Sequence, residues 1–171
     1  MADQSDPLPV DTTPALRVVF ICSGNICRSP MAELAFRERL AEVGMARAVK
    51  VGSAGIGPWH AGEPIDPRAA RTLAAAGIPT VHVATQVDEC HLAADLLLAM
   101  DSGHYRELVR QIEKSGGDPS TVRMFRSFDP EADGDLDVPD PYYGGRDGFT
   151  DLLTVIERTV GGLLDWVREQ R

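Results

Sequence analysis

The sequence predicts an α/β fold in which a twisted parallel sheet carries helices on both faces. Two observations support this prediction: short apolar runs alternate with longer helical patterns, and neither an internal repeat nor an interdomain linker interrupts them. The chain has 171 residues, which is enough for a single domain with its own hydrophobic core.

Strands are predicted where an apolar run is short and is bounded by residues that favour turns. Four runs meet this description, at residues 18–21, 49–53, 96–100 and 122–125. A short segment at residues 80–83 is ambiguous between strand and loop. Residues 127–145 are rich in acidic residues, prolines and glycines, so we expect a long loop there.

Helices are predicted where apolar residues recur on one face at helical spacing. They cover residues 31–43, 67–77, 102–114 and the segment from about residue 147 onward, with a short helix after residue 88. Asp66, Asp88 and Asp101 precede three of these helices, and an aspartate in that place caps the first turn. Pro67 suits a first helical position.

The composition excludes several classes of protein. A net charge of −9 argues against nucleic acid or an anionic membrane as a partner. No apolar run approaches the roughly 20 residues of a membrane-spanning helix.

Residues 1–16 lack the pattern of a secretory signal, so we expect a disordered tail before one domain over residues 17–171. Three cysteines are too few for a disulfide framework, which favours a cytoplasmic location.

The most informative stretch is residues 20–30, Phe-Ile-Cys-Ser-Gly-Asn-Ile-Cys-Arg-Ser-Pro, between the first strand and the first helix. Ligands of open parallel sheets bind beyond the carboxyl ends of strands, and Cys22 stands at such an end. Gly24 and Asn25 tolerate left-handed backbone angles, so successive N–H groups can converge on an anion. Arg28 adds a planar fork that holds two phosphate oxygens.

Cys22 is the candidate nucleophile of this loop. A thiol becomes a nucleophile when it loses its proton, and a helix start beside an arginine favours the thiolate. Ser29 can donate a hydrogen bond to that thiolate. The alternative is a buried apolar cysteine. The strand before Cys22, the turn after it and the helix start at Pro30 agree with each other, and together they favour the nucleophile.

A reaction through a phosphorylated cysteine also needs a proton for the leaving group. Residues 129–140 contain five aspartates and one glutamate. An aspartate beside aromatic residues, in a loop that reaches the site, suits this role best. That argument favours Asp140 and then Asp137, and the residues alone do not separate the two.

Residues 22–30 resemble the signature of the low molecular weight protein tyrosine phosphatases. The resemblance extends from Arg17 to the C-terminus. It continues in Met-Ala-Glu at 31–33, Ser-Ala-Gly at 53–55, Asp-Pro-Arg-Ala at 66–69, Met-Asp at 100–101 and Asp-Pro-Tyr-Tyr-Gly at 140–144.

The resemblance implies a four-stranded parallel sheet and hydrolysis of phosphotyrosine without a metal or any other cofactor. It implies that Cys22 attacks the phosphorus and that Asp140, rather than Asp137, is the general acid and later the general base. Arg28 and the loop amides, from Ser23 through Gly24, Asn25, Ile26 and Cys27, would hold the phosphate oxygens.

Further roles are implied by the same resemblance. Asn25 and Ser53 would hold the loop in shape, and His82 is either a second support of that loop or an ordinary surface or core histidine. Trp59, Tyr142 and Tyr143 are candidates for the wall of the pocket. The family position of Ser23 varies and lines the entrance, so it leaves substrate preference open. Cys27 is either a filler beneath the loop or a partner for a reversible disulfide with Cys22.

Three alternatives remain. An arsenate reductase on the same fold needs two further cysteines near each other, and this chain has only Cys90 in that region. A phosphoarginine phosphatase goes with a small polar threonine where this chain has Ile26. A catalytically idle phosphate-binding module normally lacks the nucleophile or the acid, and both are present.

The implied partners are phosphotyrosine proteins, with inorganic phosphate as product or inhibitor. A cognate tyrosine kinase of the same cell is one candidate, and a host protein reached by export without a signal peptide is another. The four histidines are scattered along the sequence and do not form a metal site with the cysteines.

Overall fold

The computed structural model describes residues 14–170, except for the side chain of Arg146. Its central sheet has four parallel strands in the order β2-β1-β3-β4, which confirms the predicted fold class. The strands are β1 (Leu16–Cys22), β2 (Val49–Gly55), β3 (Leu96–Ala99) and β4 (Val122–Met124).

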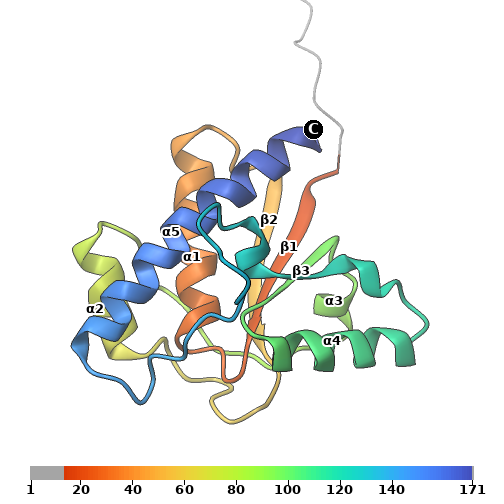
Figure 1. Cartoon of the computed structure of the whole chain (residues 1–171), viewed down its shortest axis with the longest axis horizontal. Helices are drawn as coiled ribbons and strands as arrows, with labels where there is room; N and C mark the ends of the chain where they lie inside the picture. Colours follow the sequence, from red (N-terminus) through yellow and green to blue (C-terminus); the bar gives the residue numbers. More distant parts are fainter. Residues whose placement is uncertain (1–13, 171) are drawn as a thin grey trace, which may run out of the picture.

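Helices cover both faces of the sheet (Figure 1). On one face lie α1 (Arg28–Glu42), α2 (Pro67–Ala75) and α5 (Arg146–Glu169). On the other lie α3 (Glu89–Leu92) and α4 (Ser102–Lys114). Two short 3₁₀ helices, η1 (Pro119–Thr121) and η2 (Phe125–Phe128), flank β4. No helix in the described part of the chain is long and apolar enough to cross a membrane.

The side chains of β1 divide the core into two halves because successive residues of a strand face opposite sides of the sheet. Val18, Phe20 and Cys22 pack on the side of α1, α2 and α5. Val19 and Ile21 pack on the other side, with Leu108 and Ile112 of α4. β1 is therefore buried on both faces, which places the loop after it at a rigid edge of the sheet.

The three predicted aspartate caps are present. Asp66 accepts a hydrogen bond from the Arg68 N–H at 2.8 Å, Asp88 from the His91 N–H at 3.0 Å and Asp101 from the His104 N–H at 2.9 Å. Each cap satisfies an N–H group that would otherwise lack a partner in the first helical turn.

The boundaries differ from the expectation at several points. α1 begins at Arg28 rather than Met31, so the arginine belongs to the helix itself. β2 runs on to Gly55, which pairs with Cys22, whereas β4 stops before Phe125 and continues as η2. Residues 80–83 form only an isolated bridge between Pro64 and Val83. Residues 1–13 of the expected tail lie outside the described residues, and β1 begins at Leu16.

The long acidic loop is fixed at both ends. The buried carboxylate of Asp129 accepts hydrogen bonds from Arg158 at 2.7 and 2.9 Å and from Arg126 at 3.2 Å. The Arg158 hydrogen bonds hold the pKa of Asp129 well below its usual range. Further along, the Val138 N–H donates to the Met100 carbonyl at the end of β3. These anchors bring Asp140 back to the edge of the sheet where β1 ends.

Two adjacent glycines in α5 have different surroundings. A Cβ on Gly162 would overlap the Phe128 carbonyl oxygen of η2, whereas the nearest atom to a Cβ on Gly161 is the flexible end of Arg39 at 3.7 Å. Gly162 therefore allows α5 to approach η2, and through η2 the start of the acidic loop.

Gly162→Ala should lower the free energy of unfolding by about 1–3 kcal/mol, because the added methyl group pushes α5 away from η2. Gly161→Ala is the matched control and should raise the free energy of unfolding by about 0.5–1 kcal/mol, because alanine is the better helix former. Urea denaturation of both variants measures the difference. Equal stabilities would contradict the close contact between α5 and η2.

Candidate active site

A pocket of about 330 Å³ opens where the loop after β1 meets the ends of the acidic loop and of the loop after β2. Its walls contain most of the residues singled out from the sequence. The lining residues are Cys22, Ser23, Gly24, Ile26, Cys27, Arg28, Trp59, His60, Asp140, Tyr142 and Tyr143.

Several carbonyl groups of the loop point away from this pocket, because each of them has a donor outside it. The carbonyl of Cys22 accepts from the Ile56 N–H at 2.9 Å, and that of Ser23 accepts from the Gly57 N–H at 3.2 Å. The carbonyl of Ile26 accepts from the Asp66 N–H at 3.0 Å, which ties the start of α2 to the loop. With the carbonyls turned outward, the N–H groups of the loop are left to face an anion in the pocket.

Asn25 holds the curve of the loop. Its φ angle is 61°, and it is the only non-glycine residue with positive φ among residues 14–170. Its amide Nδ2 donates to Ser29 Oγ at 2.8 Å and to Ser53 Oγ at 2.9 Å, while Oδ1 accepts from the Thr85 N–H at 3.0 Å. The left-handed conformation is costly for most residues, and these hydrogen bonds stabilise it.

His82 supports the same residue from outside. Its Nε2 lies 2.7 Å from the Asn25 carbonyl oxygen, and a carbonyl can only accept, so Nε2 carries the proton. The sequence left two interpretations of His82 open, a support of the loop or an ordinary surface or core histidine. The structure places His82 against the loop. Ser53, at the fifth position of β2, reaches the loop through the Asn25 amide.

Cys22 lies at the base of the pocket with 3% of its surface exposed. Its Sγ is 2.9 Å from Ser29 Oγ. Because Ser29 Oγ already accepts from Asn25, the hydroxyl proton of Ser29 is free to point at the sulfur. The Asn25 amide therefore orients a hydroxyl that can donate to a thiolate at Cys22.

Arg28 is held by three oxygen atoms at one side of the pocket. Its Nη1 donates to Asp101 Oδ2 at 3.1 Å and to the Val138 carbonyl at 3.0 Å. Its Nη2 lies 3.5 Å from Asp140 Oδ2. The side chain is buried, with 5% of it exposed, so its position is set before any ligand arrives.

Asp140 and Asp137 occupy different places. Asp140 lines the pocket, where its Oδ1 accepts from the Tyr142 N–H at 3.0 Å and 42% of its side chain is exposed. Asp137 does not line the pocket, and its Oδ1 accepts from the Ser102 N–H at the start of α4. The geometry thus separates two residues that local composition did not separate, although the family resemblance already pointed to Asp140.

Cys27 is the second cysteine of the loop and is buried, with 5% of its surface exposed. Burial raises the pKa of its thiol, and the nearby Asp66 carboxylate adds to the rise. Cys27 is therefore a protonated thiol, not a second thiolate, although it lines the same pocket.

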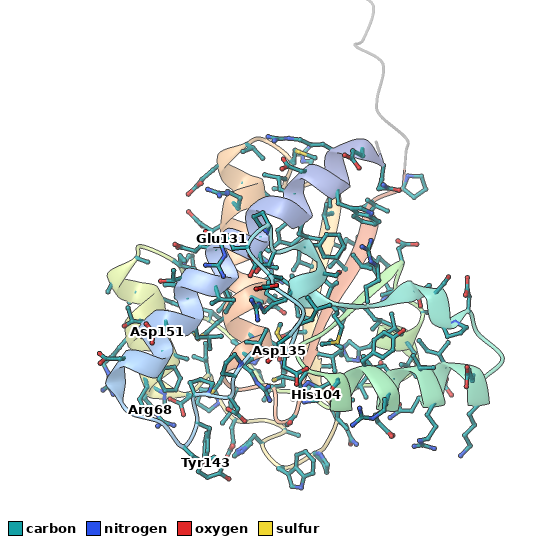
Figure 2. The ribbon with its side chains drawn as sticks, viewed as in Figure 1. Arg68, His104, Glu131, Asp135, Tyr143 and Asp151 are labelled. Atoms are coloured by element: carbon teal, nitrogen blue, oxygen red, sulfur yellow. The ribbon has the colours of Figure 1, made fainter. Side chains whose placement is uncertain are left out.

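The aromatic wall is exposed. Trp59 is 68% exposed, Tyr142 36% and Tyr143 91%. The tyrosine rings meet edge to face at 4.9 Å, and the Arg68 guanidinium lies 5.3 Å from the Tyr142 ring centre while its Nη1 donates to the Tyr142 carbonyl at 3.0 Å. Figure 2 shows Arg68 and Tyr143 on the side of the molecule where α2 and α5 meet this edge. Large rings at a pocket mouth suit an aryl ligand.

Two histidines at this site were not predicted from the sequence. His60 lines the pocket and forms a short hydrogen bond with Glu63, and a Cβ on Gly24 would lie 2.7 Å from its ring. His104 contacts Ser23 from α4. Neither stands in a motif, so no local signal pointed to them. Among the described residues, no cluster of three histidine, cysteine or carboxylate side chains could hold a metal ion.

The fold and the pocket define a class: an α/β protein that presents a buried cysteine inside an anion-binding loop at the carboxyl edge of a parallel sheet. Comparison with known proteins narrows the class. The family model described as low molecular weight phosphotyrosine protein phosphatase matches residues 17–171. The chain belongs to this family, which confirms the resemblance seen in the sequence.

Individual relatives agree with this assignment. A low molecular weight protein-tyrosine-phosphatase of Streptomyces coelicolor is 50% identical over 156 residues, covering 90% of this chain and 94% of the relative. A crystal structure of a protein tyrosine phosphatase from Entamoeba histolytica has a TM-score of 0.85 at 26% identity, covering 91% of this chain and 99% of that one. The arginine phosphatase YwlE shares the fold with a TM-score of 0.79 at 28% identity, covering 91% and 98%.

Asn25→Gly should lower the free energy of unfolding by about 2–4 kcal/mol, because it leaves buried polar partners without hydrogen bonds while keeping the left-handed backbone accessible. Asn25→Ala should cost about 1 kcal/mol more, because alanine resists that backbone conformation. Urea denaturation of the pair isolates the backbone contribution. If the alanine variant were as stable as the glycine variant, the left-handed loop would be refuted.

Proposed function

We propose that this enzyme hydrolyses phosphotyrosine in proteins through a cysteinyl phosphate on Cys22. The observation that carries this proposal is the position of Cys22 Sγ. The sulfur is buried at the base of an anion-binding loop, 2.9 Å from a hydroxyl that can donate to it, and the carboxylate of Asp140 lies at the mouth of the same pocket.

In the first step, the Cys22 thiolate attacks the phosphorus in line with the tyrosyl oxygen. The S–P bond forms, the P–O bond to tyrosine breaks, and Asp140 in its acid form gives its proton to the departing phenolate. The loop N–H groups and Arg28 hold the other three oxygens, so the charge of the transition state meets donors already in position.

In the second step, a water molecule attacks the phosphorus from the side that tyrosine has left. Asp140, now a carboxylate, takes a proton from that water, the new P–O bond forms and the S–P bond breaks. The thiolate is restored and inorganic phosphate leaves, after which phosphate can bind again as a product inhibitor. Neither step requires an electron donor or a cofactor.

The pocket supports an aryl substrate over phosphoarginine. Ile26 lines the pocket with an aliphatic side chain, and Trp59 and Tyr142 add aromatic surface beside it. An aliphatic and aromatic wall favours a phenyl ring, whereas a guanidinium group prefers hydrogen-bond acceptors near its N–H groups. The similarity to an arginine phosphatase therefore extends to the fold, and the lining supports phosphotyrosine.

Arsenate reduction has less support. Such a reaction must pass a disulfide from the first cysteine to others, and the chain contains three cysteines in all. The carbonyl group of Cys90 accepts a hydrogen bond from Arg17 near the amino end of β1, whereas Cys22 is the last residue of that strand. Cys90 thus lies toward the amino ends of the strands, whereas the pocket lies at their carboxyl ends.

The proposed partners are phosphotyrosine proteins, including a cognate tyrosine kinase. We assign the activity to one domain that begins with β1 at Leu16 and acts in the cytoplasm. A pull-down with a substrate-trapping Asp140→Ala variant, followed by identification of the bound phosphoproteins, tests the choice of partner.

Cys22→Ser should abolish turnover of a phosphotyrosyl peptide, because a serine hydroxyl in this setting is a far weaker nucleophile than a thiolate. Asp140→Asn should lower kcat/KM, which reports the first step alone, by about 10²–10⁴-fold with this peptide, because its phenolate needs a proton to leave. The loss should be much smaller with a substrate whose leaving group is a better one, such as para-nitrophenyl phosphate. Equal losses with both substrates would show that Asp140 is not the acid.

We further propose that Cys22 and Cys27 form a reversible disulfide under oxidation. Both thiols line the same pocket, and Cys27 can trap a sulfenic acid at Cys22 before further oxidation. Mild peroxide should give a Cys22–Cys27 disulfide, seen by mass spectrometry, and thiol addition should restore activity. In Cys27→Ser, the same treatment should cause irreversible loss. A Cys22–Cys90 link, or equal recovery of both proteins, would count against this proposal.

A further inference from the structure

A buried histidine in the first turn of α4 contacts the loop from the side opposite Asn25. His104 has 5% of its surface exposed, and its Nε2 lies 2.8 Å from Ser23 Oγ. Ser23 is the residue directly after Cys22 and lines the same pocket. Figure 2 shows His104 at the start of α4, at the edge of the sheet where the pocket lies.

The neighbouring residue Asp101 connects this histidine to the other end of the loop. Asp101 Oδ2 accepts from Arg28 Nη1 at 3.1 Å, and Asp101 Oδ1 accepts from the His104 backbone N–H at 2.9 Å. His104 Nδ1 lies 3.3 Å from the same Oδ1 but has no hydrogen bond of good geometry. At the start of α4, His104 thus contacts Ser23, the residue after the nucleophile, and Asp101 contacts Arg28, the arginine at the end of the loop.

The imidazole of His104 is neutral at ordinary pH. Burial lowers its pKa to about 4, and Arg28 adds to this effect, against the opposing influence of Asp101, Asp140 and Asp137. The single ring proton belongs on Nδ1, because a lone pair there would face the carboxylate of Asp101. Nε2 is then an acceptor, and the Ser23 hydroxyl donates to it.

Ser23, His104 and Asp101 follow one another in contact as the members of a serine–histidine–aspartate triad do. The basicity of His104, however, does not fit the role of the general base in such a triad. A base whose conjugate acid has a pKa of about 4 removes a serine proton poorly near neutral pH. The hydrogen bond instead fixes the direction of the Ser23 side chain and, through it, the start of the loop.

We propose that His104 is a positioning residue that holds Ser23, so that the first turn of α4 fixes both ends of the loop around Cys22. This inference rests on the proposed function, because it assigns His104 to the geometry of that reaction. Ser23 and His104 are 81 positions apart in the sequence, so the hydrogen bond joins the loop after β1 to the helix after β3.

Two pairs of variants of nearly equal shape test the hydrogen bond. Methionine and glutamine are similar in size, but only His104→Gln keeps a polar atom that can accept near the position of Nε2. Valine and threonine are similar in size, but only Ser23→Thr keeps the hydroxyl. The comparison within each pair cancels most of the cost of repacking.

We expect His104→Met to lower kcat for para-nitrophenyl phosphate by about tenfold or more relative to His104→Gln, because a small displacement of the loop disturbs the attack geometry. KM should rise by no more than about threefold, because the displaced loop receives phosphate less well but keeps most of its N–H donors. Ser23→Val should lose as much relative to Ser23→Thr. The Ser23→Val, His104→Met double variant should lose no more than either single variant, because both remove one interaction.

A second measurement does not depend on turnover. The rate of alkylation of Cys22 by the anion iodoacetate, divided by its rate with neutral iodoacetamide, reports how well the loop and Arg28 receive an anion. Mass spectrometry of the Cys22 peptide excludes reaction at the exposed Cys90. The ratio should fall in His104→Met and in Ser23→Val and should stay near the wild-type value in the glutamine and threonine variants.

The outcomes are decisive in both directions. Equal kcat and equal alkylation ratios for the methionine and glutamine variants, or full additivity in the double variant, would overturn the role of His104. A normal alkylation pattern in a wild-type protein that lacks phosphatase activity would instead refute the proposed function and leave the positioning role supported. Urea denaturation confirms that each variant is folded before the rates are compared.

Discussion

The left-handed backbone of Asn25 is the constraint on which the rest of the site depends. With φ at 61°, the loop turns its carbonyl groups outward and leaves its N–H groups facing the pocket. The Asn25 amide also donates a hydrogen bond to Ser29 Oγ, which leaves the Ser29 hydroxyl proton to point at the sulfur of Cys22. One residue therefore joins anion binding to the chemistry of the nucleophile, and His82 and Ser53 contribute by holding that residue in place.

The parallel sheet explains why distant segments can support so short a loop. β1 lies between β2 and β3, so the carboxyl ends of its neighbours flank the loop on both sides. The β2 side supplies Ser53 and the N–H groups of Ile56 and Gly57. The β3 side supplies Asp101 and His104 at the start of α4. The chain has a net charge of −9, yet the pocket is prepared for an anion by N–H groups, a helix start and one arginine.

Local signals in the sequence were sufficient for much of this description. The apolar run before Cys22, the aspartate caps and the loop motif each report on contacts within a few residues, and the structure confirms the strands and caps. Longer-range contacts were out of reach. Nothing near His104 indicates that it meets Ser23, and nothing near Asp137 indicates that the helix start at Ser102 occupies its carboxylate. β4 ends at Met124 and the chain continues as η2, where the buried Phe125 ring packs against Phe20 at 5.5 Å, a contact far apart in the sequence.

The proposed mechanism passes phosphate through a covalent bond to Cys22. Rapid acid quenching during the first turnover of a phosphotyrosyl peptide, followed by mass spectrometry, tests this claim directly. One phosphate should appear on the peptide that contains Cys22, attached to the cysteine sulfur, and it should disappear as the substrate is consumed. Release of phosphate with no labelled cysteine, or with the label on Ser23 or another residue, would contradict the proposed mechanism.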